Sequence, residues 1–446
     1  MENRTIIDYY RAMDRVRQKL RSILHALGTY LKTDMIYLTK GGFWLTLNNV
    51  VTAPLVFITS IVFANRIPAY EYGVYKFLLS IMGILSITTL SGMGSILSQA
   101  VARGREGSLF LILKTKIRWG LFGSAASLVV SANYFIHHNT TLGVSFLIAA
   151  IFIPIMDSLN IYQDYLLGKK LFRDSSVSYS ISQLVAVIVM IGTLFLTKNV
   201  IIIFGVYLSS WTLIRFGFFL RTIEKYPPNN ETDPSTIPYG KRSSFIDFLA
   251  TIIGSIDQAI IFHFLGAVEL ALFSFASAPV TQLVGLFKNI PALAMPKMAA
   301  RPIQEIDSLL HKRILYAFLV AVALSGVYML AAPFIYHLFF PKYIDSINLS
   351  RVFSLTLLFA IPQTILGPAV SSKVTSIPPK MLHLWNIPGF LSTVFLLATV
   401  QSIGLISIIY ARLILVASSF IVAYYLWHFI VKKDRQTPSL ITIDTN

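Results

Sequence analysis

Two cations lie inside long apolar stretches of the sequence, where a charge needs a partner or a function. Lys288 lies in the last third of one stretch, with Gln282 beside it on the same expected helix, and Arg412 lies near the middle of another. A charge at the centre of a hydrocarbon layer costs about 2.5–3.5 kcal/mol on insertion scales, so both are candidates for binding an anion. Alternatively, Lys288 extends its ammonium to the membrane surface, or Arg412 pairs with an acid on another helix.

Two acids lie in the middle of apolar stretches. They are Asp257 and Asp157. The spacing of Asp157, Asn160 and Asp164 is i, i+3 and i+7, which places the three residues on one helix face. Burial favours the protonated form of a carboxylate, which suits a site that couples transport to a proton or sodium gradient. The alternative is a fixed ion pair with Lys288 or Arg412.

Other polar residues lie nearer the ends of the expected helices. Arg66, Lys76 and Arg351 lie near ends predicted to face outward, where they either edge a vestibule for an anionic headgroup or anchor the protein at the interface. Asn48 could bind sugar hydroxyls or hydrogen-bond to a neighbouring helix. Arg215 is expected to extend to the cytoplasmic surface.

Catalytic and metal-binding motifs are not evident. There is no cysteine, so thiolate chemistry and disulfides are excluded. We find no phosphate-binding glycine loop with its lysine, no histidine pair at metal-ligand spacing and no nucleophile elbow. We therefore predict no catalytic residue, no metal site and no cofactor.

Long apolar stretches position these polar residues. Hydrophobic residues make up 55% of the sequence and charged residues 13%, against about 25% in soluble domains. A helix of about 20 apolar residues spans the hydrocarbon core, so the sequence predicts an all-α polytopic membrane protein with about twelve transmembrane helices. The expected spans are 43–65, 74–99, 117–137, 141–166, 175–197, 199–220, 244–264, 268–295, 314–340, 349–371, 381–399 and 402–430.

Lys and Arg residues are sorted between alternate gaps of this pattern. Most of the 37 lie in one set of gaps, and the other set holds only Arg66, Lys198 and Lys342. Loops rich in Lys and Arg stay in the cytoplasm, so we expect both termini there. We attribute the net charge of +17 to loops that face anionic lipid, and we expect no nucleic-acid partner.

The chain has signs of an internal repeat. A shift of 198 residues aligns Glu71 with Glu269 and Lys114 with Lys312, and span order and loop charge also coincide. Six spans per half predict two pseudo-symmetric six-helix lobes around a central cavity, because paired repeats recur in transporters. The expected units are a leader 1–40, a lobe 41–221, a cytoplasmic linker 222–243, a second lobe 244–431 and a cytoplasmic tail 432–446.

The basic leader has apolar residues at helical spacing between residues 8 and 31. This pattern predicts an amphipathic helix on the cytoplasmic membrane surface. The alternative is a docking site for a partner enzyme.

Short segments of the chain are similar to a known membrane protein family. GGFW at 41–44 followed by ANRIPAYEYGVY at 64–75 resembles the start of polysaccharide-type flippases, in which a segment ending in Tyr-Gly-x-Tyr leads from helix one into helix two. The resemblance covers nearly the whole chain from about residue 40. The leader is a departure, because members usually start close to the first span. Further similar segments are SGMGS at 91–95, VAR at 101–103, SIDQ at 255–258, FLG at 264–266, the stretch 291–296 and FFPKY at 339–343.

The resemblance points to the O-antigen (Wzx-type) or oligosaccharide flippases, in a superfamily that also holds multidrug/cation antiporters and lipid II flippases. It implies movement of a polyprenyl-pyrophosphate-linked oligosaccharide, such as a lipopolysaccharide repeat unit, from the cytoplasmic to the outer leaflet of the bacterial inner membrane. Partners would be the lipid bilayer, a glycan polymerase and glycosyltransferases. A multidrug/cation antiporter is the first alternative. A membrane glycan polymerase or ligase is the second, but the short outer loops disfavour it.

Overall fold

The computed structural model describes residues 35–287 and 290–436, and every regular element within these ranges is helical. Eleven helical segments there are long and apolar enough to cross a membrane. The expected seventh span corresponds to a further helix, α10, whose apolar part is Thr251–Phe264. The chain is therefore an all-helical, multi-pass membrane protein, which confirms the predicted fold class.

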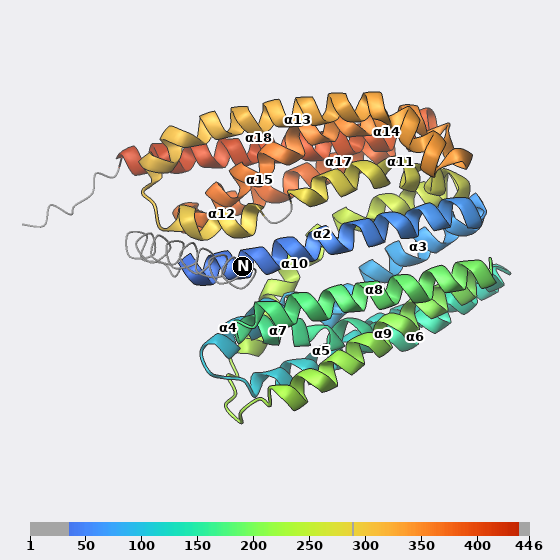
Figure 1. Cartoon of the computed structure of the whole chain (residues 1–446), viewed down its shortest axis with the longest axis horizontal. Helices are drawn as coiled ribbons and strands as arrows, with labels where there is room; N and C mark the ends of the chain where they lie inside the picture. Colours follow the sequence, from blue (N-terminus) through green and yellow to red (C-terminus); the bar gives the residue numbers. More distant parts are fainter. Residues whose placement is uncertain (1–34, 288–289, 437–446) are drawn as a thin grey trace, which may run out of the picture.

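Helices α2 to α9 form the first half of the chain. Figure 1 shows α5 to α9 on one side of the molecule and α13 to α18 on the other, with α2 between them. The first-half elements are α2 (Met35–Arg66), α3 (Ala69–Leu85), η1 (Ser86–Thr89), α4 (Met93–Ala102), α5 (Ser108–Ile136), α6 (Thr140–Leu159), α7 (Ile161–Gly168), α8 (Phe172–Leu196) and α9 (Val200–Lys225).

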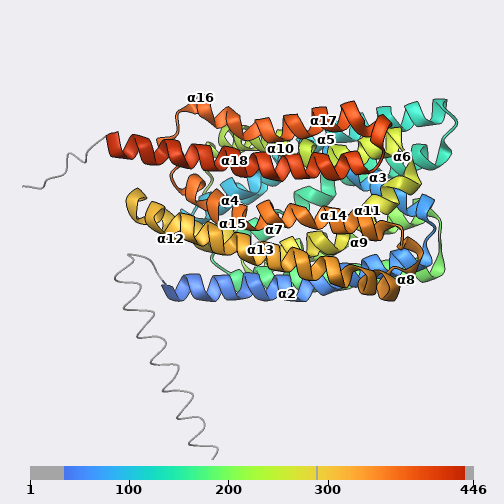
Figure 2. The same cartoon turned by 90° about the horizontal axis from the view of Figure 1, so that it is seen from above.

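Helices α10 to α18 form the second half. Seen from above, α2 lies along one long edge of the molecule and α17 along the opposite one (Figure 2). The second-half elements are α10 (Thr236–Phe264), α11 (Ala267–Leu286), α12 (Ile290–Ala299), α13 (Ile303–Phe339), η2 (Pro341–Tyr343), α14 (Ser346–Phe353), η3 (Ser354–Thr356), α15 (Leu357–Ser372), η4 (Val374–Ser376), α16 (Pro379–Leu382), η5 (His383–Asn386), α17 (Ile387–Ile403) and α18 (Ile406–Gln436).

Several expected spans are interrupted, at matching places in the two halves. The expected span 74–99 is wrong as a single helix, because Leu90 adopts a left-handed conformation with φ 59° and separates η1 from α4. Span 268–295 is likewise divided into α11 and α12. The fourth and tenth spans also change course, at Asn160 and at η3. This correspondence supports the internal repeat, and interrupted helices are typical of binding regions in transporters.

The halves meet where α3 packs against α10 and α11. A Cβ on Gly73 would lie 1.8 Å from the carbonyl oxygen of Ala267, so only glycine permits this approach. Rings stack across the same joint, with centroids 4.3 Å apart for Tyr72 and Phe275 and 3.9 Å apart for Phe77 and Phe262. Such pairs contribute about 0.5–1.5 kcal/mol each beyond their buried area.

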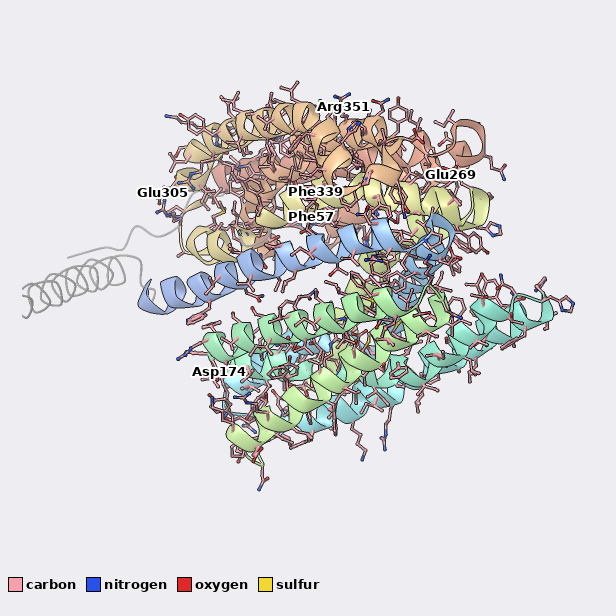
Figure 3. All side chains as sticks on the ribbon, turned by 45° about the vertical axis from the view of Figure 1, so that its right-hand side comes forward. Phe57, Asp174, Glu269, Glu305, Phe339 and Arg351 are labelled. Atoms are coloured by element: carbon pink, nitrogen blue, oxygen red, sulfur yellow. The ribbon has the colours of Figure 1, made fainter. Side chains whose placement is uncertain are left out.

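Contacts also join α2 to the second half. The rings of Phe57 and Phe339 meet edge to face at 5.6 Å, and Figure 3 shows them side by side on α2 and α13. Asn65 donates to the carbonyl of Phe339 at 3.0 Å, and Lys342 donates to the carbonyl of Asn65 at 2.7 Å. We call the end of the molecule that contains Arg66, Lys198 and Lys342 the far end, and the opposite end the basic end.

The connection between the halves is shorter than the expected linker 222–243. Helix α9 continues to Lys225 and α10 begins at Thr236. Asn229 donates to the carbonyl of Gly104 at 2.8 Å, so the loop is held against the start of α5. Hydrogen bonds from Ser235 keep the pKa of Asp233 below its ordinary value. The division into domains stays a prediction, and the amphipathic helix expected at 8–31 lies outside the described residues.

Candidate functional site

A polar cavity of about 300 Å³ lies beside the break between α3 and α4. Lys116 of α5, Asp157 of α6 and Asp164 of α7 line it together with Asn160. The other walls come from η1 and from Thr251 of α10. The helix break leaves backbone groups without their usual partners, which favours a polar cavity at this place. We call this space the first-half cavity.

Asp164 of the first-half cavity packs directly against a glycine of α4. A Cβ on Gly94 would be 2.4 Å from Oδ2 of Asp164, so a larger residue would displace the carboxylate. Ser98 of α4 donates to the backbone carbonyl of Asp164 at 2.7 Å. These contacts fix α7 against α4 and hold the carboxylate in place.

Lys116 is 5% exposed, and its Nζ donates to the carbonyl of Leu90 at 3.3 Å. Leu90 is the left-handed residue that ends η1, a conformation that is uncommon for residues with a side chain. Asp157 and Asp164 both interact electrostatically with Lys116. The ammonium therefore compensates carboxylate charge inside the cavity and binds the interrupted backbone.

Asp157 has a second cationic partner, Arg215 of α9. The Nη1 atom of Arg215 is 2.6 Å from Oδ1 of Asp157 and also donates to the carbonyl of Met156 at 2.8 Å. The Arg215 side chain is only 16% exposed. The expectation that Arg215 extends to the surface is therefore wrong, because an acid on α6 provides a nearer partner. Among the described residues, the ion-pair partner of Asp157 is thus Arg215 and not Arg412.

A second charged cluster lies around α10. Asp257, which is 5% exposed, accepts from Nε of Arg412 at 2.8 Å, and the Nη2 atom of Arg412 contacts the same oxygen. Lys76 of α3, in the other half, interacts electrostatically with Asp257. We call Lys76, Asp257 and Arg412 the central triad. It contains two cations and one acid from three helices, and it spans the joint between the halves.

Arg215 and Arg412 occupy equivalent places in the repeat. Each lies on the last helix of its half, α9 or α18, and a shift of 198 residues places Arg215 one position from Arg412. Each binds an acid on an earlier helix of its own half. The structure contains the ion pair that the sequence allowed for Arg412, and its role as a cavity cation stays a prediction.

The remaining predicted residues that the structure describes line neither cluster. The guanidinium of Arg66 lies 4.1 Å from the ring centroid of Phe195, which fits interfacial anchoring. Nε of Arg351, labelled in Figure 3, donates to the carbonyl of Met329 at 2.9 Å. Asn48 accepts a hydrogen bond of 2.7 Å from Ser180 of α8, and Gln282 is half-buried on α11. Lys288 lies outside the described residues.

The sequence pattern did not indicate that Lys116 lies inside the protein. The expected third span began at residue 117, which assigned Lys116 to a loop, whereas α5 begins at Ser108. The available signal was that no proline or glycine occurs between Ser108 and Trp119, so nothing ends a helix there.

Comparison with known proteins agrees with this architecture. The model of the polysaccharide biosynthesis protein family matches residues 38–295. The eukaryotic MATE transporter AtDTX14 has a similar structure, with a TM-score of 0.59 and 12% identity over 90% of this chain and 99% of that one. A MATE in complex with MaD5 gives a TM-score of 0.58 and 14% identity, over 89% and 96% of the two chains.

An outward-facing multidrug resistance MATE family transporter of the MOP superfamily gives a TM-score of 0.54 at 13% identity, over 90% of this chain and 97% of that one. No curated protein sequence matches the chain. The structural likeness at this identity establishes a MATE-like fold. Because the family model covers more than half of the sequence, the chain belongs to the polysaccharide biosynthesis protein family.

Proposed function

We propose that the chain is a flippase, which moves a polyprenyl-pyrophosphate-linked oligosaccharide from the cytoplasmic to the outer leaflet of a bacterial inner membrane. The substrate class includes O-antigen and related lipopolysaccharide repeat units. Family membership supports a role in polysaccharide biosynthesis. The interrupted helices and the joint along α3, α10 and α11 support alternating access, in which the two halves rock against each other.

The central triad is the observation that carries this proposal. Arg412 pairs with Asp257, and Lys76 interacts electrostatically with the same carboxylate, so the cluster has an excess of one positive charge when Lys76 is protonated. Charged groups within a membrane are expensive and mark substrate pathways. An excess positive charge at the joint suits a pyrophosphate, and it disfavours a cationic substrate.

The first-half cavity is a candidate site for ion coupling. Asp157 and Asp164 line it with Lys116, which also donates to the carbonyl of Leu90 at the helix break. Protonation of Asp164, or binding of a sodium ion to the carboxylates of Asp157 and Asp164, would alter the charge beside the break. Either event offers a physical route from an ion gradient to the movement of the halves.

A multidrug/cation antiporter is the second candidate, and the MATE-like fold favours it. The two acids of the first-half cavity would then hold a cation. The two candidates differ in the sign of the substrate charge, so lipid analysis separates them. A glycan polymerase or ligase is a weaker alternative.

The test is mass spectrometry of lipid extracts from cells depleted of the protein, with a leaflet-access probe for the glycan. The flippase proposal expects a polyprenyl-pyrophosphate oligosaccharide to accumulate on the cytoplasmic side. Unchanged lipid-linked glycans with altered tolerance to cationic compounds would favour the antiporter. Accumulation on the outer side would favour a polymerase or ligase.

A further inference from the structure

An apolar groove of about 390 Å³ lies between α5 of the first half and α10 of the second half. Trp119 and Phe122 line it from α5, and Phe245 and Phe248 line it from α10. Phe122 and Phe245 are 65% and 73% exposed, so their rings are accessible to a ligand from the membrane. Figure 2 shows α5 and α10 near each other on the side of the molecule away from α2.

Cations precede the aromatic rings on both helices. Lys241 and Phe245 of α10 are spaced i, i+4, and so are Arg118 and Phe122 of α5, so each pair shares a helix face. Both helices begin at the basic end, which places each cation about 6 Å nearer that end than its ring. Nζ of Lys241 lies 4.7 Å from the ring centroid of Trp119, so the cation of one half contacts an aromatic wall of the other.

We propose that this groove binds an anionic phospholipid of the bilayer, with an acyl chain between the aromatic walls and the phosphate at Lys241 and Arg118. Charge complementarity identifies this occupant, because Lys241 is charged and no acid occurs among the described residues that line the groove. Cations beside aromatic rings are also the residues that favour the headgroup region. The basic end is expected to face the cytoplasmic leaflet, which carries anionic lipid.

The bound lipid would also affect the movement of the two halves. One wall of the groove belongs to each half, and Ile87 of η1 lines both this groove and the first-half cavity. A lipid that binds the groove more tightly in one arrangement of the halves than in another stabilises the first arrangement. The free energy of this stabilisation equals the difference between the two binding free energies. The groove is therefore a regulatory lipid site, distinct from the proposed substrate route at the central triad.

Native mass spectrometry of the purified full-length protein tests this proposal. The protein is given equal amounts of phosphatidylglycerol and phosphatidylcholine with identical acyl chains, and the retained lipid is counted. We expect preferential retention of phosphatidylglycerol, and a loss of about fivefold for each of Lys241→Gln and Arg118→Gln. Phe245→Ala/Phe248→Ala should weaken retention of the same lipid by removing the walls. Lys312→Gln is the matched control, because Lys312 also lies over an exposed ring, that of Tyr316, but on α13.

Three results would overturn the proposal. The first is equal retention of the two lipids by the wild-type protein. The second is an equal loss in Lys241→Gln and Lys312→Gln, which would assign the effect to general surface charge. The third is displacement of phosphatidylglycerol by an equal amount of polyprenyl phosphate, which would assign the groove to the substrate lipid. Thermal unfolding of each variant checks that it is folded.

Discussion

The guanidinium of Arg412 on α18 binds the carboxylate of Asp257 on α10, which connects the last helix of the second half to its first. Nε lies 2.8 Å from Oδ2, and Nη2 also donates to the carbonyl of Gly254 at 3.3 Å. The Asp257 side chain is 8% exposed and that of Arg412 is 24% exposed. The pair therefore has both a structural role and, with Lys76, an electrostatic one.

Substitutions at this pair separate the two roles. Arg412→Gln removes the hydrogen-bonded cation from a buried acid and should lower the free energy of unfolding by up to about 3–5 kcal/mol. Arg412→Gln/Asp257→Asn removes both charges and should restore most of that stability. It also leaves the positive charge of Lys76, so transport by the double variant should exceed that by Arg412→Gln. Thermal unfolding and accumulation of lipid-linked glycan measure the two effects.

The result that would contradict this assignment is a double variant as stable as the wild type but no more active than Arg412→Gln. The guanidinium itself would then be required, and the excess charge of the triad would not explain transport.

Substitution of Lys76, the first-half member of the central triad, tests whether the excess positive charge of the triad is needed for transport. Lys76→Gln reduces the triad to one cation and one acid, so we expect cytoplasmic accumulation of the lipid-linked glycan with normal amounts of folded protein. Lys198→Gln is the control, because Lys198 is exposed in a connection at the far end. Equal accumulation in both variants would show that far-end charge in general, and not the triad, is needed.

Substitution of Asp164 tests whether its carboxylate couples transport to an ion gradient. Asp164→Asn keeps the size of the side chain beside Gly94 but removes its charge, so transport in proteoliposomes should lose its response to an imposed proton or sodium gradient. Asp174→Asn is the control, because Asp174, labelled in Figure 3, lies at the surface and its Oδ1 is 2.8 Å from Nζ of Lys225. A variant at residue 164 that responds to gradients as the wild type does would exclude this carboxylate as the coupling group.

Sequence alone predicted the features that depend on local apolar content. The membrane class and the positions of most helices follow from stretches of about 20 residues. The shared face of Asp157 and Asp164 also followed from spacing, and both line one cavity. The ion-pair partners that lie on distant helices could not be predicted from the sequence. Pairing Arg215 with Asp157 requires knowing that α9 packs on α6, and the depth of Lys116 depends on where α5 begins.

Substitution of Gly73 tests whether the close approach of α3 to α11 keeps the two halves together at the far end. A Cβ at this position would lie 1.8 Å from the carbonyl oxygen of Ala267, so Gly73→Ala must move α3 away from α11. Such overpacking costs about 1–3 kcal/mol, and it should shift the population toward states in which the far end is open. Gly192→Ala is the control, because nothing lies within 4 Å of a Cβ there and alanine favours a helix.

The shift can be measured directly because the chain contains no cysteine, so a single introduced thiol is the only reactive one. Ala271 of α11 is fully buried, and Ala271→Cys should therefore react slowly with a membrane-impermeant thiol reagent. Adding Gly73→Ala should accelerate that reaction several-fold, whereas adding Gly192→Ala should not. Equal rates in the two double variants would mean that α3 accommodates the methyl group without opening the joint, and that Gly73 does not control the approach of the two halves.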